Sequence, residues 1–305
     1  MQMNTIKLSN GIKIPSLGFG PGGCGYNPHK QKPSYTQRAF DKIMRSINLN
    51  TKTEREYVNS IAEAIRLGFR LIDYSESYGD GTLLRKAIAK SGVSREQLFL
   101  TTRIKNSSQI RGSVKEDFVA QLKGMGTDYV DLLQFHWPVT DYYLKTWKEM
   151  ELLQKGGLCK MLGVANCNKH HLEEILSICE IKPVVGQFEV HPLFTQKALI
   201  DYYKSQNVQV EAYTPLARHD DRLFDLPLLK NLANKYGKTI AQVILRWNIQ
   251  NGCIPIVRSF NSKHQKEILD IFDFELSNEE MTSIDSININ SRLRYDPDNC
   301  DFSIL

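Results

Sequence analysis

Short apolar runs alternate with longer amphipathic stretches along nearly the whole chain. Eight of these runs are rich in β-branched and aromatic residues, which is typical of β-strands. Several are apolar almost throughout, as expected of strands that are covered on both faces. The predicted strands are Ser16–Gly20, Leu71–Ser75, Leu98–Ile104, Val130–Trp137, Met161–Asn166, Val184–Val190, Val208–Thr214 and Cys253–Ser259.

The stretches between these runs predict helices. Thr53–Leu67 carries apolar residues at helical spacing on one face and ends before Gly68, a residue type that commonly caps helix C-termini. Ser277 and Glu280 fit a capping box that opens a late helix reaching about Ile287. The other predicted helices are Thr82–Lys90, Ser113–Met125, Tyr142–Gln154, Lys169–Cys179, Gln196–Ser205, Thr239–Gln250 and Ser262–Ile271.

The regular alternation of strand and helix predicts a parallel sheet, and eight such units favour closure into a (β/α)8 TIM barrel. Alternating apolar residues around Asn10-Gly11 predict an N-terminal β-hairpin. An open doubly wound sheet is the alternative fold. Against it, no helix directly follows the glycine-rich segment Gly18–Gly23, and a dinucleotide-binding fingerprint requires that helix.

We expect residues 1–305 to form a single barrel domain. Residues 21–52 are long for a strand–helix connection and predict an extended loop insertion, with a short helix at Arg38–Ser46. This insertion follows a barrel strand, at the end where TIM-barrel active sites form. It either covers the substrate as a lid or is a surface loop without substrate contact. The polar tail, residues 292–305, either wraps the barrel or is a mobile end.

Composition and charge limit the function classes. The hydrophobic content of 41% and charged content of 24% are ordinary for a soluble globular protein, and the net charge of +5 comes from scattered Lys and Arg residues. We therefore expect binding to neither nucleic acid nor membrane. The first residues lack the apolar core of a signal peptide, and the six cysteines lack zinc-ligand spacing. These features predict a cytoplasmic protein without a metal site.

Polar or aromatic residues follow the apolar strands one after another. Any one of them could be a turn cap or a hydrogen-bonded core residue. Together they predict a shared site, because the carboxyl ends of barrel strands converge on one face. These residues are Asp73, Tyr78, Arg103, Lys105, His136, Trp137, Asn166, Gln187, Glu189, Tyr213, Arg258 and Ser259.

The chemistry of this set suits carbonyl reduction. A tyrosine can protonate the forming alkoxide if a nearby cation lowers its phenolic pKa, and a carboxylate can hold that cation in place. A neutral histidine can orient the carbonyl through a hydrogen bond. Because no protein side chain donates hydride, a nicotinamide cofactor is implied.

Several segments match one known family in residue type, order and spacing. The matching segments are Gly68–Gly79, Asp131–Pro138, Leu162–Asn166, Gln187–Pro192, Ala212–Leu216 and Gly237–Trp247. On these segments the chain resembles the aldo-keto reductases, from about Ile6 to Arg292.

The resemblance implies that NADPH binds in an extended conformation across the barrel mouth, that the substrate is a small carbonyl compound and that the protein is a monomer. Asp73, Tyr78 and His136 would be three of the four catalytic residues, with Tyr78 as the general acid. Trp137 would line the substrate pocket together with Tyr78 and His136.

The resemblance also implies a set of cofactor contacts. Asn166 and Gln187 would hold the nicotinamide carboxamide, and Tyr213 would stack on the nicotinamide ring. The 2′-phosphate would meet Arg258 and a neighbouring serine. The complete implied set is Asp73, Asn166, Gln187, Tyr213, Thr214, Leu216, Arg258, Ser259, His264 and Glu267, with Glu267 contacting the adenine.

The fourth catalytic position departs from the family pattern. Arg103 stands where the family carries its catalytic lysine, and Lys105 follows two positions later. Arginine stays charged and can pair with Asp73 through two hydrogen bonds, so it can still lower the pKa of Tyr78. A register shift that brings Lys105 into the site is the alternative, although the neighbouring residues favour Arg103.

The cofactor contacts also depart from the family pattern. Ala165 replaces a serine that would give the carboxamide one more hydrogen bond, and its loss costs about 1 kcal/mol. His264 stands where an arginine commonly helps to bind the 2′-phosphate, and Ile268 replaces an asparagine beside the adenine. Phosphate recognition then depends mainly on Arg258, and we expect NADP rather than NAD.

The sequence therefore predicts an NADPH-dependent reductase of aldehydes or ketones. Tyr78 would be the acid, Asp73 and Arg103 would tune it, and His136 would orient the carbonyl. The alternative is an NADP(H)-binding sensor or regulatory protein with weak or lost catalysis, which the replacement at Arg103 and the fewer cofactor contacts would fit. A metal-dependent hydrolase is disfavoured, because the sequence contains no recognisable His/Asp ligand cluster.

Overall fold

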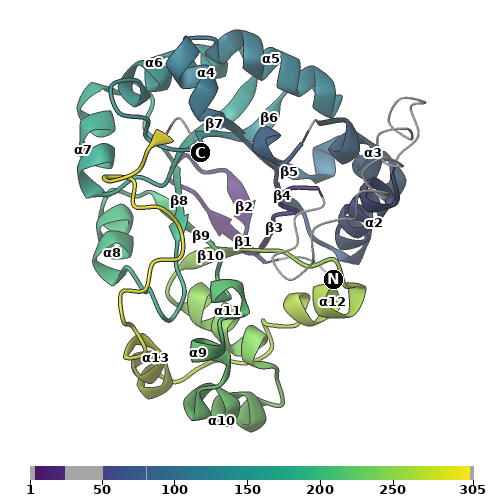
Figure 1. The fold of residues 1–305 in the computed structure, drawn as a ribbon, viewed down its shortest axis with the longest axis vertical. Helices are drawn as coiled ribbons and strands as arrows, with labels where there is room; N and C mark the ends of the chain where they lie inside the picture. Colours follow the sequence, from purple (N-terminus) through teal and green to yellow (C-terminus); the bar gives the residue numbers. More distant parts are fainter. Residues whose placement is uncertain (1–3, 25–50, 80, 303–305) are drawn as a thin grey trace.

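The computed structural model describes residues 4–24, 51–79 and 81–302. Within them, eight parallel strands form a closed ring, and helices surround it (Figure 1). The ring closes where Val257 of the last strand lies opposite Phe19 of the first. This closure confirms the predicted TIM barrel and excludes the open doubly wound sheet. The strands are β3 (Gly18–Phe19), β4 (Leu71–Asp73), β5 (Phe99–Ile104), β6 (Val130–Phe135), β7 (Cys159–Ala165), β8 (Val185–Glu189), β9 (Gln209–Tyr213) and β10 (Cys253–Val257).

The predicted N-terminal hairpin is also present, as β1 (Thr5–Lys7) and β2 (Lys13–Pro15). Gly11 has a φ of 85°, a left-handed conformation that glycine adopts without steric cost. Leu8 and Ile14 are buried among apolar residues of β4, β5 and β6. The hairpin therefore closes the amino-terminal end of the barrel and leaves the carboxyl ends of the strands as the open end.

Helices cover the outside of the ring, and the predicted ones are confirmed to within two residues at each end. Of the described helices, none is long and apolar enough to cross a lipid bilayer. The helices that the sequence predicted are α2 (Lys52–Leu67), α3 (Gly81–Ser91), α5 (Val114–Met125), α6 (Tyr143–Lys155), α7 (Lys169–Ile178), α8 (Lys197–Ser205), α11 (Ile240–Gln250), α12 (Ser262–Leu269) and α13 (Asn278–Asp285). The additional ones are α4 (Asn106–Arg111), α9 (Asp221–Phe224), α10 (Pro227–Tyr236) and the 3-10 turns η1 (Glu76–Tyr78), η2 (Arg95–Gln97) and η3 (Ala217–His219).

The predicted insertion, residues 21–52, is described only at its two ends, and the helix predicted at Arg38–Ser46 lies outside the described residues. At the near end, the hydroxyl of Tyr57 donates a hydrogen bond of 2.8 Å to the carbonyl of Gly22. At the far end, Thr51 and Glu54 form a capping box that opens α2. Both ends are therefore attached to α2 beside the barrel mouth.

The C-terminal tail crosses the open end of the barrel. In Figure 1 it runs from α13 past α8 and α7 towards the centre of the ring. The buried carboxylate of Glu189, at the end of β8, accepts hydrogen bonds from the backbone nitrogens of Leu293 (2.7 Å) and Arg294 (2.9 Å). Further along, Asn168 donates to Asp298 at 2.6 Å. The tail therefore wraps the barrel as far as residue 302, which is one of the two predicted alternatives.

Glu189 binds the tail as a carboxylate. Burial alone would raise the pKa of Glu189, but hydrogen bonds from His191, at 2.9 Å, and from the tail backbone lower it. We expect Glu189→Ala to detach the tail, because two buried N–H groups lose a charged acceptor. Trypsin cleavage after Arg292 or Arg294 should accelerate by at least about tenfold, as followed by mass spectrometry.

The matched control is Asp298→Asn, which alters the contacts of the exposed Asp298 with Asn168, His170 and His171 and leaves the hydrogen bonds to Glu189 in place. Its cleavage rate should stay close to that of the wild type. Equal cleavage of Glu189→Ala and the wild type would show that Glu189 does not hold the tail.

Candidate active site

A buried ion pair lies at the carboxyl ends of β4 and β5. Nη2 of Arg103 lies 2.7 Å from Oδ1 and 2.9 Å from Oδ2 of Asp73, and both side chains are almost fully buried. Burial alone would lower the pKa of Arg103, but Asp73 and Tyr78 outweigh this effect and raise it. The guanidinium therefore stays charged. Lys105, the alternative cation, is the N-cap residue of α4 and does not make the ion pair with Asp73.

Arg103 also reaches further across the barrel. Its Nη2 donates to Oε1 of Gln187 at 2.6 Å, and Nε2 of Gln187 donates to Glu211 at 2.8 Å. Gln187 and Glu211 are direct neighbours in the register of β8 and β9. A continuous network thus joins Asp73, Arg103, Gln187 and Glu211 inside the barrel. No role was predicted for Glu211, although the alternation of side chains along β9 points this residue inward.

Glu211 has an unusual proton affinity. Burial and the neighbouring Asp73 raise the pKa of Glu211 to about 7, although hydrogen bonding to Gln187 and the charge of Arg103 act in the opposite direction. Hydrogen bonding to Gln134 also acts to lower this pKa. Near neutral pH the network therefore carries one cation, one carboxylate and one group that titrates.

We expect this titration to affect stability. Because the folded pKa of Glu211 lies above its ordinary value of 4.5, the contribution to stability is full below pH 4.5 and is lost as pH rises to about 7. Glu211→Gln removes the titration, so the variant should gain stability relative to the wild type over this range. The gain should be at most about 3 kcal/mol, measured by urea unfolding at pH 5 and pH 8.

Glu275→Gln, at an exposed position, is the control and should change stability by the same small amount at both pH values. A difference between Glu211→Gln and the wild type that is independent of pH would contradict the titration of Glu211.

Tyr78 follows β4 at the end of η1 and is half-buried. Its ring packs edge-on against Tyr74, with the centroids 6.5 Å apart. Burial raises the pKa of Tyr78, and Arg103 is the charge that opposes this rise most strongly. The phenol therefore carries its proton at neutral pH, and Arg103 is the cation that favours its phenolate most strongly.

His136 directly follows β6 and is also half-buried. Burial and the cations Arg103 and Arg294 lower the pKa of His136 to about 3. The imidazole is therefore neutral near pH 7 and can donate one hydrogen bond. Arg103 and Arg294 also act to lower the pKa of Tyr78. The same two guanidinium groups therefore affect the pKa of both rings.

A second set of side chains surrounds the ends of β7 and β9. The hydroxyl of Tyr213 donates to Oδ1 of Asn166 at 2.7 Å, and Nδ2 of Asn166 donates to the carbonyl of His136 at 2.7 Å. Asn166 and Thr214 have φ values of 58° and 52°, which are left-handed conformations that cost energy for residues other than glycine. These backbone conformations turn the chain sharply at the barrel mouth.

This set of side chains is suited to hydrogen-bond the carboxamide group of a nicotinamide. The ring of Tyr213 is half-exposed at the mouth, and Asn166 keeps one N–H and one lone pair available besides its hydrogen bonds to His136 and Tyr213. Gln187 fits less completely, because its oxygen accepts from Arg103 and its nitrogen donates to Glu211. Only the second lone pair of the Gln187 oxygen remains to accept a hydrogen bond from a carboxamide.

The predicted phosphate and adenine contacts lie along the β10–α12 connection and the start of α12. Arg258 stacks on the ring of Phe260 at 4.8 Å, and the carbonyl of Ser259 is fixed by Ser60 and Gln265. Of the remaining predicted residues, His264 is exposed on α12, Glu267 is half-exposed on the same helix, and Leu216 and Thr214 follow β9.

Trp137 is buried at the end of β6, next to the tail. Its ring centroid lies 6.4 Å from those of Tyr295 and Phe302 and 6.3 Å from that of His136. The pocket wall predicted at Trp137 thus includes two aromatic residues of the tail. The sequence did not reveal them, because their position depends on the attachment of the tail to Glu189.

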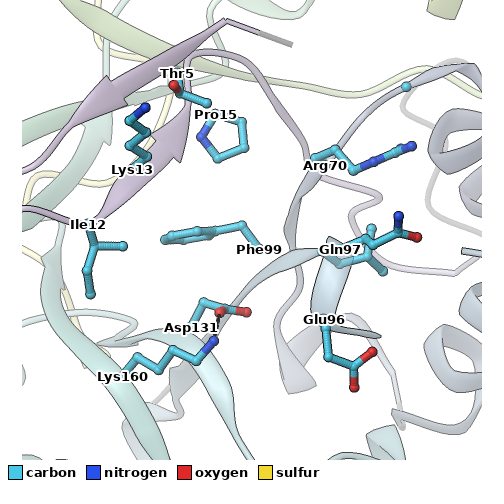
Figure 2. A pocket seen from close by; sticks show the side chains of 12 residues that line it. Thr5, Ile12, Lys13, Pro15, Arg70, Glu96, Gln97, Phe99, Asp131 and Lys160 are labelled. Carbon is cyan, nitrogen blue, oxygen red and sulfur yellow. Dashed lines mark hydrogen bonds and ion pairs between the residues drawn. The ribbon is translucent and has the colours of Figure 1, made fainter. Parts of the chain in front are cut away.

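Two other features lie outside this site. A cavity of about 550 Å³ lies at the amino-terminal end of the barrel, between the β1–β2 hairpin and the strand starts. Figure 2 shows Phe99 between Ile12 and Gln97, with Asp131 paired to Lys160 at 2.9 Å. This cavity lies at the end of the barrel opposite the residues predicted to act together.

The second feature is a cluster of His170, His171 and Asp298, whose potential metal-ligating atoms lie within 4.8 Å of one another. Nδ1 of His171 accepts the backbone N–H of Asn168 at 3.2 Å, so the neutral ring carries its proton on Nε2. Nε2 of His171 lies 3.7 Å from Oδ1 of Asp298, beyond hydrogen-bond distance, and Nε2 of His170 lies 3.3 Å from the same oxygen.

The comparisons with known proteins agree with this geometry. A family model described as "Aldo/keto reductase family" matches residues 44–289. A glyoxal reductase of Bacillus subtilis is 38% identical over 295 residues, covering 97% of this chain and 96% of the relative. A methylglyoxal reductase of Escherichia coli is 36% identical and covers 96% of each chain.

Solved structures give the same result. The crystal structure of a Bombyx mori aldo-keto reductase in complex with NADP has a TM-score of 0.83 and 31% sequence identity, covering 98% of this chain and 97% of that chain. An aldo/keto reductase from Brucella melitensis has a TM-score of 0.80 and 34% identity, covering 94% of this chain and all of that chain. The chain belongs to the aldo/keto reductase family.

Proposed function

We propose that Tyr78 is the general acid of an NADPH-dependent reduction of an aldehyde or ketone to an alcohol. The observation that carries the proposal is the buried Arg103–Asp73 ion pair beside Tyr78, with a neutral His136 in the same field. NADPH, when bound, supplies the hydride that attacks the carbonyl carbon. The chain itself must therefore supply the proton and the orientation of the substrate.

Each side chain has one task in this proposal. The hydroxyl of Tyr78 transfers its proton to the carbonyl oxygen and is reprotonated from solvent. Arg103 stabilises the phenolate formed in this step, and Asp73 fixes the guanidinium. His136, which is neutral, donates a hydrogen bond to the carbonyl oxygen, and Trp137 excludes water from the pocket.

The residues that would hold NADPH are those of the second set and of the β10–α12 connection. We assign the nicotinamide end to Asn166, Gln187 and Tyr213, with Asp73, Thr214 and Leu216 beside them. We assign the 2′-phosphate and adenine end to Arg258, Ser259, His264 and Glu267. Arg258 supplies the charge that favours NADPH over NADH.

Two relatives support small dicarbonyl compounds as substrates, since one is a glyoxal reductase and the other a methylglyoxal reductase. The test measures NADPH consumption and alcohol formation with glyoxal, methylglyoxal and simple aldehydes. Turnover with NADPH and much slower turnover with NADH are expected. Tight NADPH binding without reduction of any carbonyl would favour the sensor or regulatory role instead.

We further propose that the chain acts as a monomeric, single-domain enzyme in the cytoplasm. The six cysteines are free, which suits a reducing compartment. Light scattering coupled to size-exclusion chromatography tests the oligomeric state, and a mass near twice that of the chain would contradict it.

A further inference from the structure

Arg294 lies in the tail at the barrel mouth. Its backbone nitrogen is bound to Glu189 at the end of β8, and the next residue, Tyr295, packs against Trp137 at the end of β6. The tail therefore holds Arg294 between two strand ends that border the site. The side chain is half-exposed, so a ligand entering the mouth can reach it.

The charge of Arg294 acts on the site itself. It lowers the pKa of His136, and it opposes the burial that raises the pKa of Tyr78 and of Tyr213. These directions are those expected of a cation held at the barrel mouth, where the backbone of Arg294 is bound to Glu189 and its guanidinium lies 5.7 Å from the ring centroid of Tyr295. Arg292, two residues earlier, also opposes the rise in the pKa of Tyr213, and its cation lies over the ring of Phe194 at 4.7 Å.

The two guanidinium groups near Tyr78 differ in what they bind. Arg103 is occupied by Asp73, Gln187 and the carbonyl of Tyr74. Arg294 forms no ion pair with any carboxylate in the part of the chain that the structure describes, and its cation lies over the ring of Tyr295 at 5.7 Å. Its hydrogen-bond donors are thus available to an anion in the pocket.

We propose that Arg294 binds a carboxylate of the carbonyl substrate, so that the preferred substrates are oxo acids. This inference rests on the proposed reduction, because it places the carbonyl oxygen between Tyr78 and His136. The carboxylate of the same molecule then points outward to Arg294. In this arrangement Trp137 and Tyr295, whose rings pack together, flank the part of the substrate between its carbonyl and its carboxylate.

The test compares aldehyde acids with their uncharged methyl esters. Glyoxylate, succinic semialdehyde and 4-carboxybenzaldehyde place the carboxylate at increasing distance from the carbonyl. The wild type should reduce at least one acid with a kcat/KM about tenfold above that of its ester. Arg294→Leu should lower the ratio of acid to ester kcat/KM to about one, mainly through a higher KM for the acid. The ratio is taken within each variant, so an effect of the lost charge on Tyr78 and His136 cancels.

Two further variants and a change in salt concentration test whether the charge of Arg294 causes the preference. Arg294→Lys keeps the charge and should restore part of the preference. Arg292→Leu is the matched control from the same tail and should leave the preference intact. Added salt should raise the KM for the acid in the wild type and not in Arg294→Leu, because an exposed charge pair is screened.

The outcomes separate this inference from the proposed function. Reduction of the esters without any preference for an acid would overturn the role of Arg294, as would an equal loss in Arg292→Leu. Weaker NADPH binding by Arg294→Leu, measured by fluorescence quenching, would assign the arginine to the cofactor and also overturn it. No reduction of any aldehyde would overturn the proposed reduction, and this inference with it.

Discussion

Replacing Tyr78 by Phe is expected to lower kcat by about 10³-fold while NADPH binding persists, because general acid catalysis typically contributes 10²–10⁴-fold. The change removes one hydroxyl and keeps the ring that packs against Tyr74. Stopped-flow NADPH oxidation measures the loss, and fluorescence titration measures binding.

The matched control is Tyr203→Phe. Tyr203 is fully buried, whereas Tyr78 is half-buried, and the hydroxyl of Tyr203 donates to the carbonyl of Cys167 at 2.9 Å. This variant should lose about 1 kcal/mol of stability and keep its turnover. Equal turnover of Tyr78→Phe and the wild type would show that another group donates the proton.

The second large effect is expected from Arg103→Met. The variant leaves Asp73 and Glu211 in the barrel without their cation, and an unpaired buried charge typically costs about 3–5 kcal/mol. Glu211 already has its pKa raised to about 7, partly by Asp73, and Arg103 is a charge that lowers it. Without Arg103 this pKa rises further, so the folded state takes up protons.

The direction of the pH dependence follows from this shift. A carboxyl group whose folded pKa is raised favours folding at low pH and opposes it as pH rises through the folded pKa. Arg103→Met should therefore lose less stability relative to the wild type at pH 5 than at pH 8, as measured by urea unfolding. A loss that is equal at both values would contradict the role of the guanidinium as the counter-charge.

Arg103→Lys is the control that keeps the charge. An ammonium can pair with Asp73, but it is a point charge and lacks the planar fork of arginine. We expect it to retain most of the stability and at least the wild-type activity on small aldehydes. A well-folded Arg103→Lys variant without activity would show that the contact from Arg103 to Gln187 has a task of its own.

The fold could be predicted because its signals are local. Each barrel strand is a short apolar run between amphipathic helices, and eight repeats leave few arrangements. Helix α10 was missed although its sequence carries the relevant signals. Pro227 stands at its first turn, Leu229 and Leu232 are buried on one face, and Gly237 caps it with a φ of 63°.

The site was predictable only in part. Asp73, Arg103 and His136 could be grouped because carboxyl ends of parallel strands meet at one end of a barrel. The contact between Arg103 and Gln187 could not be predicted, because it depends on side-chain conformations on strands that are far apart in the sequence. The same holds for Arg294, whose place depends on a carboxylate more than a hundred residues earlier.

The left-handed backbone at Asn166 and Thr214 has a consequence for engineering. Such conformations cost of order 1–3 kcal/mol each. They therefore lower the free energy of unfolding, while they set the course of the backbone at the ends of β7 and β9. Thr214→Gly would relieve the strain and raise the melting temperature, but it would loosen the turn that follows Tyr213. Asn166→Gly would also remove the amide that binds the carbonyl of His136 and the hydroxyl of Tyr213. Selection for heat resistance and selection for turnover are thus opposed at the ends of β7 and β9.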